Sequence, residues 1–192
     1  MTITFQRFFG NVDFSAEILS DNDETPGIPA YSYPGAIPDA WVPGISVMVK
    51  NASDVGSWVG HFRQGRESPN GAQLCCAHPD GKNLVVVSRG APFVVQVKHP
   101  AVWKELSVRP VLGYGVAAAE GVLVLYGFST MMGLRSDGTL WTSRQLSWDE
   151  VRDVKVTNGK ITGAGWDAPT SSFFPFEVDA WTGESVGGSA PP

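Results

Sequence analysis

Apolar residues along the chain alternate with polar ones or form short runs rich in Val, Leu, Phe and Trp, and glycine and proline interrupt them repeatedly. This pattern is typical of short strands in an antiparallel all-β protein, whereas an amphipathic helix would repeat its apolar residues every three or four positions. The predicted strands cover residues 3–9, 45–49, 57–63, 73–77, 84–88, 93–98, 108–114, 116–119, 122–128, 131–135, 140–143, 151–156, 160–166 and 174–179.

Tight turns between these strands are marked by dipeptides that end in glycine. Asp-Gly and Asn-Gly supply the positive φ angles that short hairpin turns require. We therefore expect hairpins over 134–141 and 154–161. The dipeptides are Asp80-Gly81, Glu120-Gly121, Asp137-Gly138, Asn158-Gly159 and Thr182-Gly183.

Two short helical turns are also predicted. In residues 99–106, Pro100 occupies a plausible first helical position. In residues 147–150, Ser147 and Glu150 match a capping box. The longest apolar run, 121–128, is too short for a membrane helix.

The residue pattern of the chain changes near residue 67. Residues 1–67 are predicted to form an N-terminal β lobe with a long Pro/Gly-rich loop at 21–43, and residues 68–188 an array of antiparallel hairpins. Residues 189–192 are expected to be a tail. Tyr31, Tyr33 and Trp41 indicate that the long loop packs onto another surface. Together these parts are expected to form one compact unit.

Composition and charge narrow the choice of function. The chain has a net charge of −5 and no cluster of Lys and Arg, which a nucleic-acid-binding surface needs. Its content of 43% hydrophobic residues excludes a disordered chain. The N-terminus has no secretory signal pattern, so a cytoplasmic protein is expected. The adjacent Cys75 and Cys76 are expected to be free thiols that face opposite sides of a strand. No cofactor or metal site is expected.

From about residue 71 to residue 188 the chain resembles β-propeller blades. The segment 78–87 begins with His-Pro-Asp-Gly, as in such repeats, and 176–184 is similar to the Asp-x-x-Thr-Gly element of quinoprotein-type blades. A similar texture occurs in uncharacterised bacterial all-β proteins. The resemblance implies packed antiparallel sheets and brings no activity or quinone-binding residues with it. Because a closed propeller needs at least four blades of four strands, we expect an open sandwich or a partial propeller.

No motif for catalysis stands out. The chain lacks a G-x-S-x-G nucleophile elbow, a phosphate-binding loop and an H-E-x-x-H zinc motif. His78 and His99 are expected to end strands because each precedes a proline. We assign no catalytic residue. If the chain is an enzyme, it would be a small hydrolase with His61, or His78 with Asp80, as general base.

Aromatic residues outside the predicted core suggest a binding surface. Most of the seven tryptophans are expected in the core, but Trp148 and Trp181 lie among acidic and small residues. With Trp41, Tyr31 and Tyr33 they are candidate contacts to a protein partner.

We therefore expect a non-catalytic protein-binding module, for instance an immunity-type protein that neutralises a toxin. Its acidic charge favours a basic partner. The small hydrolase is one alternative. The other is an oligomer-forming structural subunit that assembles through strand edges or the 21–43 loop.

Overall fold

The computed structural model describes residues 3–10, 12–20, 23–35, 43–51 and 56–189, which form four β-sheets and no helix. Sheet I has the order β2 (Phe14–Leu19), β4 (Gly44–Asn51), β5 (Trp58–Arg63), β3 (Ala30–Tyr33). Sheet II has the order β1 (Phe5–Gln6), β6 (Leu74–Ala77), β7 (Asn83–Ser88), β8 (Ala91–Gln96), β9 (Trp103–Glu105). Sheet III contains β10 (Gly113–Ala117), β11 (Val122–Tyr126), β12 (Met131–Arg135) and β13 (Leu140–Thr142). Sheet IV contains β14 (Val151–Thr157), β15 (Lys160–Asp167), β16 (Ser172–Asp179) and β17 (Ser185–Gly187).

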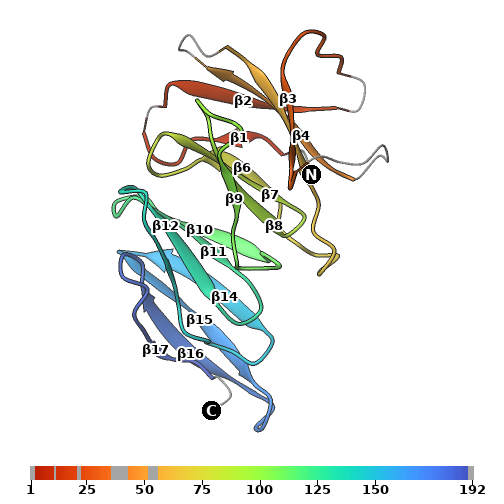
Figure 1. Ribbon diagram of the computed structural model, residues 1–192. Coiled ribbons are helices and arrows are strands. Elements are labelled where there is room, and N and C mark those ends of the chain that lie inside the picture. The colour runs from red at the N-terminus through yellow and green to blue at the C-terminus, as the bar shows by residue number, and fades with distance from the viewer. Residues whose placement is uncertain (1–2, 11, 21–22, 36–42, 52–55, 190–192) are drawn as a thin grey trace.

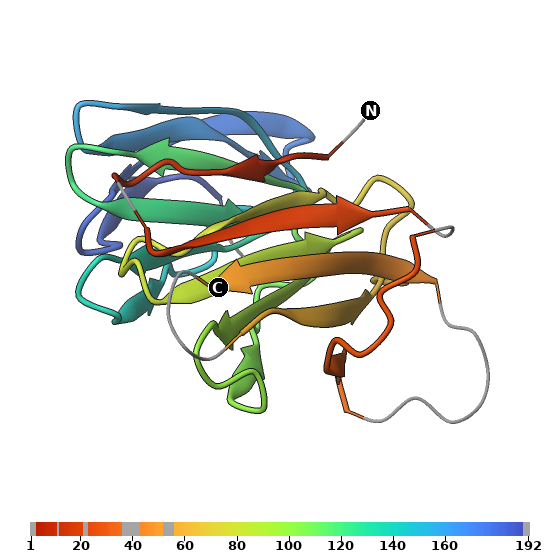
Figure 2. The same ribbon diagram turned by 90° about the horizontal axis from the view of Figure 1, so that it is seen from above.

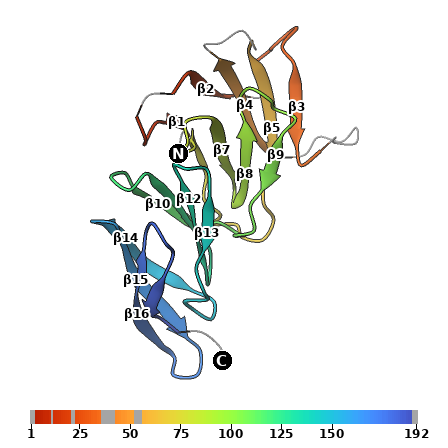
Figure 3. The same cartoon turned by 60° about the vertical axis from the view of Figure 1, so that its left-hand side comes forward.

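The four sheets are stacked in chain order, from the red and orange strands to the blue ones (Figures 1 and 3). Three apolar clusters fill the spaces between sheets I and II, II and III, and III and IV. Sheets II and III therefore bury both faces, which explains the uninterrupted apolar runs of β7 and β11. The fold is all-β and resembles a partial propeller, as the sequence predicts.

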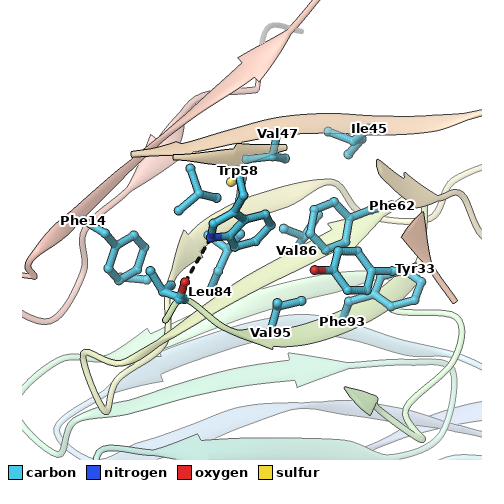
Figure 4. Close-up of a cluster of buried hydrophobic side chains, with 14 of the residues drawn as sticks. Phe14, Tyr33, Ile45, Val47, Trp58, Phe62, Leu84, Val86, Phe93 and Val95 are labelled. Atoms are coloured by element: carbon cyan, nitrogen blue, oxygen red, sulfur yellow. Dashed lines mark hydrogen bonds between the residues drawn. The ribbon is translucent and has the colours of Figure 1, made fainter. Parts of the chain in front are cut away.

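The cluster between sheets I and II is rich in aromatic side chains (Figure 4). Tyr33 stacks on Phe62 with ring centroids 4.7 Å apart, and its hydroxyl donates a hydrogen bond to the carbonyl of Pro100. The Trp58 indole N–H donates to the carbonyl of Val97 at 3.0 Å. Both polar groups are satisfied, so these large rings fill the core without an unpaired donor.

Two strands join their sheets in parallel, although most pairs are antiparallel hairpins. β1 pairs with β6, so that Phe5 lies opposite Cys75, and β3 pairs with β5. The segment that follows β1, red in Figure 2, reaches sheet III, where the Phe8 ring centroid lies 6.2 Å from that of Tyr114 in β10. The N-terminal segment thus contributes to sheet II, and the described chain forms one continuous stack across residue 67.

Neither of the two segments considered for a short helical turn forms a helix. In 99–106 the chain forms β9, where Trp103 pairs with Val95 and packs on Phe93. At 147–150 the Ser147 hydroxyl does accept the backbone N–H of Glu150, as in a capping box. It also accepts the N–H of Trp166 at 2.9 Å, which ties the chain to β15 in place of a helix.

Other elements differ from the sequence prediction in extent. β2 and β17 lie where no strand is predicted, and β3 lies inside the predicted 21–43 loop, whose residues 36–42 are outside the described part. Residues 108–112 are irregular, and β10 begins only at Gly113. In the predicted tail, Ser189 is tied to Leu146 by a backbone hydrogen bond, and residues 190–192 lie outside the described chain.

Candidate binding cleft at the inner edge

A cleft of about 760 Å³ opens between sheets II and III, beside their edge strands β1 and β10. Its walls are residues 3, 4 and 6, residues 69 and 71–75, Arg89, residues 112–114 and Tyr126. We call it the inner-edge cleft. Its volume lies in the range of small-molecule sites in proteins.

Arg89 is the single charged side chain among the described residues that line the inner-edge cleft. Neither an ion pair nor a hydrogen bond joins its guanidinium to another described residue. Because a half-buried guanidinium has five N–H donors and no acceptor, Arg89 offers unused donors to a ligand. The cleft is therefore locally positive in a protein with a net charge of −5.

The backbone of Arg89 has an unusual conformation. Arg89 and Gly90 form the two-residue turn between β7 and β8, with φ angles of 43° and 86°. Asn, Asp and Gly are the residues that adopt this left-handed region readily, so an arginine there is strained. Backbone strain of this kind is concentrated at functional sites.

Neighbouring segments hold this turn from two sides. The N–H of Gly90 donates to the carbonyl of Ala72, and the N–H of Val111 donates to the carbonyl of Gly90, both at 2.9 Å. A side chain at Gly71 would collide with the Arg89 backbone, because its Cβ would lie 2.5 Å from the Arg89 carbonyl carbon. Glycine at position 71 therefore permits the close approach that fixes Arg89.

Neutral donors lie on the other walls of the cleft. Tyr126 lies over Gly113, where a Cβ would come within 2.2 Å of its hydroxyl oxygen. Burial raises the pKa of Tyr126, so the phenol stays protonated at neutral pH. Tyr114 is 41% exposed at the rim and packs against Phe8. The side-chain amide of Gln73 adds a further donor.

The aromatic residues predicted to bind a partner occupy different places. Tyr33 is 2% exposed and belongs to the core, where Tyr31 packs edge-on against Trp58. In this arrangement both tyrosines serve the packing of sheet I. Trp41 lies outside the described residues. Neither tyrosine lines the inner-edge cleft.

Trp148 and Trp181 lie at sheet IV, far along the stack from the cleft. Trp148 is half-buried, and its indole nitrogen makes no hydrogen bond of regular geometry with another described residue. Trp181 is 39% exposed in the β16–β17 turn, with the Arg135 guanidinium 4.9 Å from its ring centroid. Trp181 thus retains an accessible surface, which keeps its predicted role open.

Two of the histidines considered in the sequence have clear structural surroundings. His78 is 3% exposed, and its Nδ1 lies 3.1 Å from both Oδ1 and the backbone nitrogen of Asp80. The sequence-based pairing of these two residues is therefore geometrically right, but the pair stabilises the β6–β7 turn. His61 Nδ1 lies 3.1 Å from Ser46 Oγ on the outer face of sheet I.

The cysteines match the prediction from the sequence. Cys75 and Cys76 are free and fully buried, and they face the clusters on opposite sides of sheet II.

In the described part of the chain, no group of three or more His, Cys, Asp or Glu side chains is placed to hold a metal ion. No helix of the described residues is long and apolar enough to cross a membrane.

Sequence reasoning did not identify Arg89. A signal was present, because Arg89-Gly90 separates two apolar strands by the length of a tight turn, and arginine is unusual at the first position of such a turn. The contribution of β1 and β10 to the same cleft could not be seen, because residues 3–6 and 112–114 meet only through the packing of sheets II and III.

Comparisons with known proteins give weak likenesses to solved structures. Neither a family model nor a curated protein matches the chain. It is similar to a chain of the S. cerevisiae complex of a Dbp5 variant with Nup159, a Gle1 variant, IP6 and ADP, at 15% identity and a TM-score of 0.39, covering 100% of this chain and 55% of that one. The N-terminal domain of Nup159, a β-propeller, matches with the same identity and TM-score over 99% of this chain and 55% of its own. A puromycin hydrolase matches at 18% identity and a TM-score of 0.39, over 74% of this chain and 24% of its own. The chain therefore spans about half the length of the first two structures.

Proposed function

We propose that the chain is a non-catalytic protein-binding module that receives its partner at the inner-edge cleft. The observation that carries the proposal is Arg89, which is held by its backbone in the wall of the cleft with no described partner for its guanidinium. No His, Asp or Glu occurs among the described lining residues, so they offer no imidazole or carboxylate as a general base. Such a cleft is suited to binding and poorly suited to acid–base chemistry.

Two features of the rim favour a protein as the ligand. β1 and β10 are edge strands of their sheets, and a free strand edge presents backbone groups to an extended polypeptide. Tyr114 adds an exposed aromatic surface beside Arg89 in the same cleft. Tyrosine and arginine are among the side chains enriched at residues that dominate binding energy in interfaces.

The test compares capture of a partner by the wild type and two variants. The immobilised protein is incubated with extract of the cells that encode it, and retained proteins are quantified by mass spectrometry. We expect a stoichiometric partner to be retained by the wild type and by Arg152→Gln, a control on the outer face of sheet IV, and to be lost from Arg89→Gln. Retention of no stoichiometric partner, or equal retention by Arg89→Gln, would contradict the proposal.

A second candidate function, a small hydrolase, is favoured by the contact between Ser46 and His61. A serine hydroxyl within hydrogen-bond distance of an imidazole is the first requirement of a serine nucleophile. A fluorophosphonate probe, which reacts with activated serines, distinguishes the two functions. Binding without catalysis predicts no labelling, whereas labelling of Ser46 that disappears in His61→Ala would support the hydrolase.

A further inference from the structure

We infer that the inner-edge cleft binds the carboxyl end of a polypeptide whose last side chain is apolar. This inference rests on the proposed function and specifies the chemistry that the partner presents. Three features of the cleft support it: the charge of its donors, the backbone packed against the Arg89–Gly90 turn and the apolar part of its walls.

The described residues of the cleft carry one positive charge, which matches the single negative charge of a carboxylate. Arg89 supplies one positive charge in a planar fork that suits two carboxylate oxygens, and the Tyr114 and Tyr126 hydroxyls supply neutral donors. A phosphate monoester carries a charge of about −1.5 to −2 at neutral pH. One guanidinium would leave part of that charge uncompensated, so a monoanion fits the cleft better.

Two backbone segments pack against the turn that carries Arg89. Residues 71–72 and 110–111 both reach the Arg89–Gly90 turn, where Gly90 bonds to Ala72 and Val111, and the Cβ of Pro110 would lie 3.0 Å from a Cβ at Gly90. These segments occupy the space on that side of the turn. A terminal carboxylate suits that geometry better than an acidic side chain in the middle of a chain.

Apolar residues form part of the remaining wall. Ile3, Leu74 and Leu112 line the cleft together with Pro69 and Ala72. Burial of an apolar side chain against these residues adds affinity in proportion to the area removed from water. The cleft therefore selects both the terminal carboxylate and an apolar residue that carries it.

Arg89 is prepared for such a ligand before binding. Its backbone is fixed by the turn and by the close approach of Gly71, so little backbone freedom is lost when the guanidinium binds a carboxylate. An arginine on an open, flexible loop would lose more conformational entropy for the same hydrogen bonds.

The experiment uses the whole chain and two matched probes. N-acetyl-Ala-Ala-Leu with a free carboxyl end and the same tripeptide with a carboxamide end are titrated by calorimetry and by ¹H–¹⁵N NMR. We expect the free acid to bind and to shift the amide signals of Gly71, Gly90 and Gly113. The carboxamide, and the free acid with Arg89→Gln, should bind at least about tenfold more weakly, because a charge-assisted bidentate contact is lost. Arg152→Gln serves as the control with unchanged affinity.

Other outcomes reject the inference. Equal binding of the acid and the carboxamide, or unchanged binding by a folded Arg89→Gln, would overturn it. Inorganic phosphate that displaces the free acid at equal or lower concentration would identify a phosphate site instead. If Arg89→Gln loses a captured protein while the two tripeptides do not differ, the proposed function stands and the terminal-carboxylate inference fails. If the tripeptides differ but no protein is captured, the carboxylate site stands and the protein partner is rejected.

Discussion

At the scale of single residues, Arg89, the proposed binding group, has a strained backbone. Its φ angle of 43° is one that asparagine or glycine adopts at lower energy. No described residue pairs with its guanidinium, so stability alone gives no reason for arginine at this position. Proteins commonly retain such local strain where a side chain serves binding.

Arg89→Asn is predicted to stabilise the fold and to weaken ligand binding. Asparagine relieves the strain of the left-handed turn, so the free energy of unfolding should rise by about 0.5–1 kcal/mol. Urea denaturation followed by tryptophan fluorescence measures the change, and the tripeptide titration measures the loss of binding. A decrease in stability would show that the Arg89 side chain makes stabilising contacts that outweigh the strain.

Cys75 and Cys76 are predicted to be unreactive in the folded protein. Burial raises the pKa of Cys75 to about 12 and that of Cys76 well above its usual value, so neither thiolate forms at pH 8. Because the thiolate is the reactive species, a thiol reagent such as DTNB should react with neither cysteine until urea unfolds the chain. Rapid reaction without denaturant would mean that sheet II opens locally.

At the scale of the strand and turn, aspartate carboxylates organise several of the hairpins. Asp80 accepts the backbone N–H groups of Lys82 and Asn83 in the β6–β7 turn. Asp179 accepts those of Trp181 and Thr182 in the β16–β17 turn. Each carboxylate satisfies backbone donors that a tight turn leaves without a strand partner. The Asp-Gly and Asp-x-x-Thr-Gly patterns of the sequence have this physical basis.

Asp80 is predicted to make the fold sensitive to acid. Burial raises the pKa of Asp80, but hydrogen bonds from His78, Lys82 and Asn83 outweigh it and hold the value at about 2, below the usual 3.8. A carboxyl group with a lowered folded-state pKa stabilises the fold above pH 4, and the contribution is lost as the pH falls toward 2. The shift corresponds to about 2 kcal/mol.

Urea denaturation at a series of pH values between 2 and 6 tests this prediction. The wild type should lose stability across pH 4 to 2, and Asp80→Asn should be less stable at pH 6 with a weaker dependence on pH in that range. An identical pH dependence in the two proteins would assign the acid sensitivity to other carboxylates, such as Asp137 and Asp179, whose pKa values are also lowered.

The structure also shows which elements local pattern could predict. The hairpin at 154–161 is confirmed, and Asn158 and Gly159 have the positive φ angles of 51° and 72° that the dipeptide predicts. The sequence pattern did not predict β9, because Trp103 is held in the sheet by its packing on Tyr33 and Phe93. Local preference predicted a helical turn there, and tertiary packing overrode it.

At the scale of the whole molecule, the two ends of the stack differ from its interior. The outer face of sheet I carries the Lys50–Glu17 ion pair, and that of sheet IV carries the Lys160–Glu177 pair. Arg152 covers the Phe173 ring of sheet IV, with its guanidinium carbon 3.4 Å from the ring centroid. Charged side chains on these outer faces oppose the stacking of a further sheet.

The chain is predicted to be monomeric. Because both end faces carry charged pairs, a second copy would have to desolvate them to extend the stack. Light scattering after size exclusion should give a mass near 20.6 kDa even at high concentration. A concentration-dependent dimer would favour the oligomer-forming alternative, and loss of that dimer in Lys160→Glu would locate its interface on sheet IV.

The sequence by itself determined the all-β class, the tight hairpins and the opposite orientation of the two cysteines, because these depend on residues that are close together in the chain. Tertiary structure decided the parallel pairing of β1 with β6, where Phe5 meets Cys75, and of β3 with β5. It also decided that Tyr33 is a core residue and that Arg89 lines a cleft. Such contacts join distant segments, and their energy comes from apolar burial between sheets, which no local pattern of residues specifies.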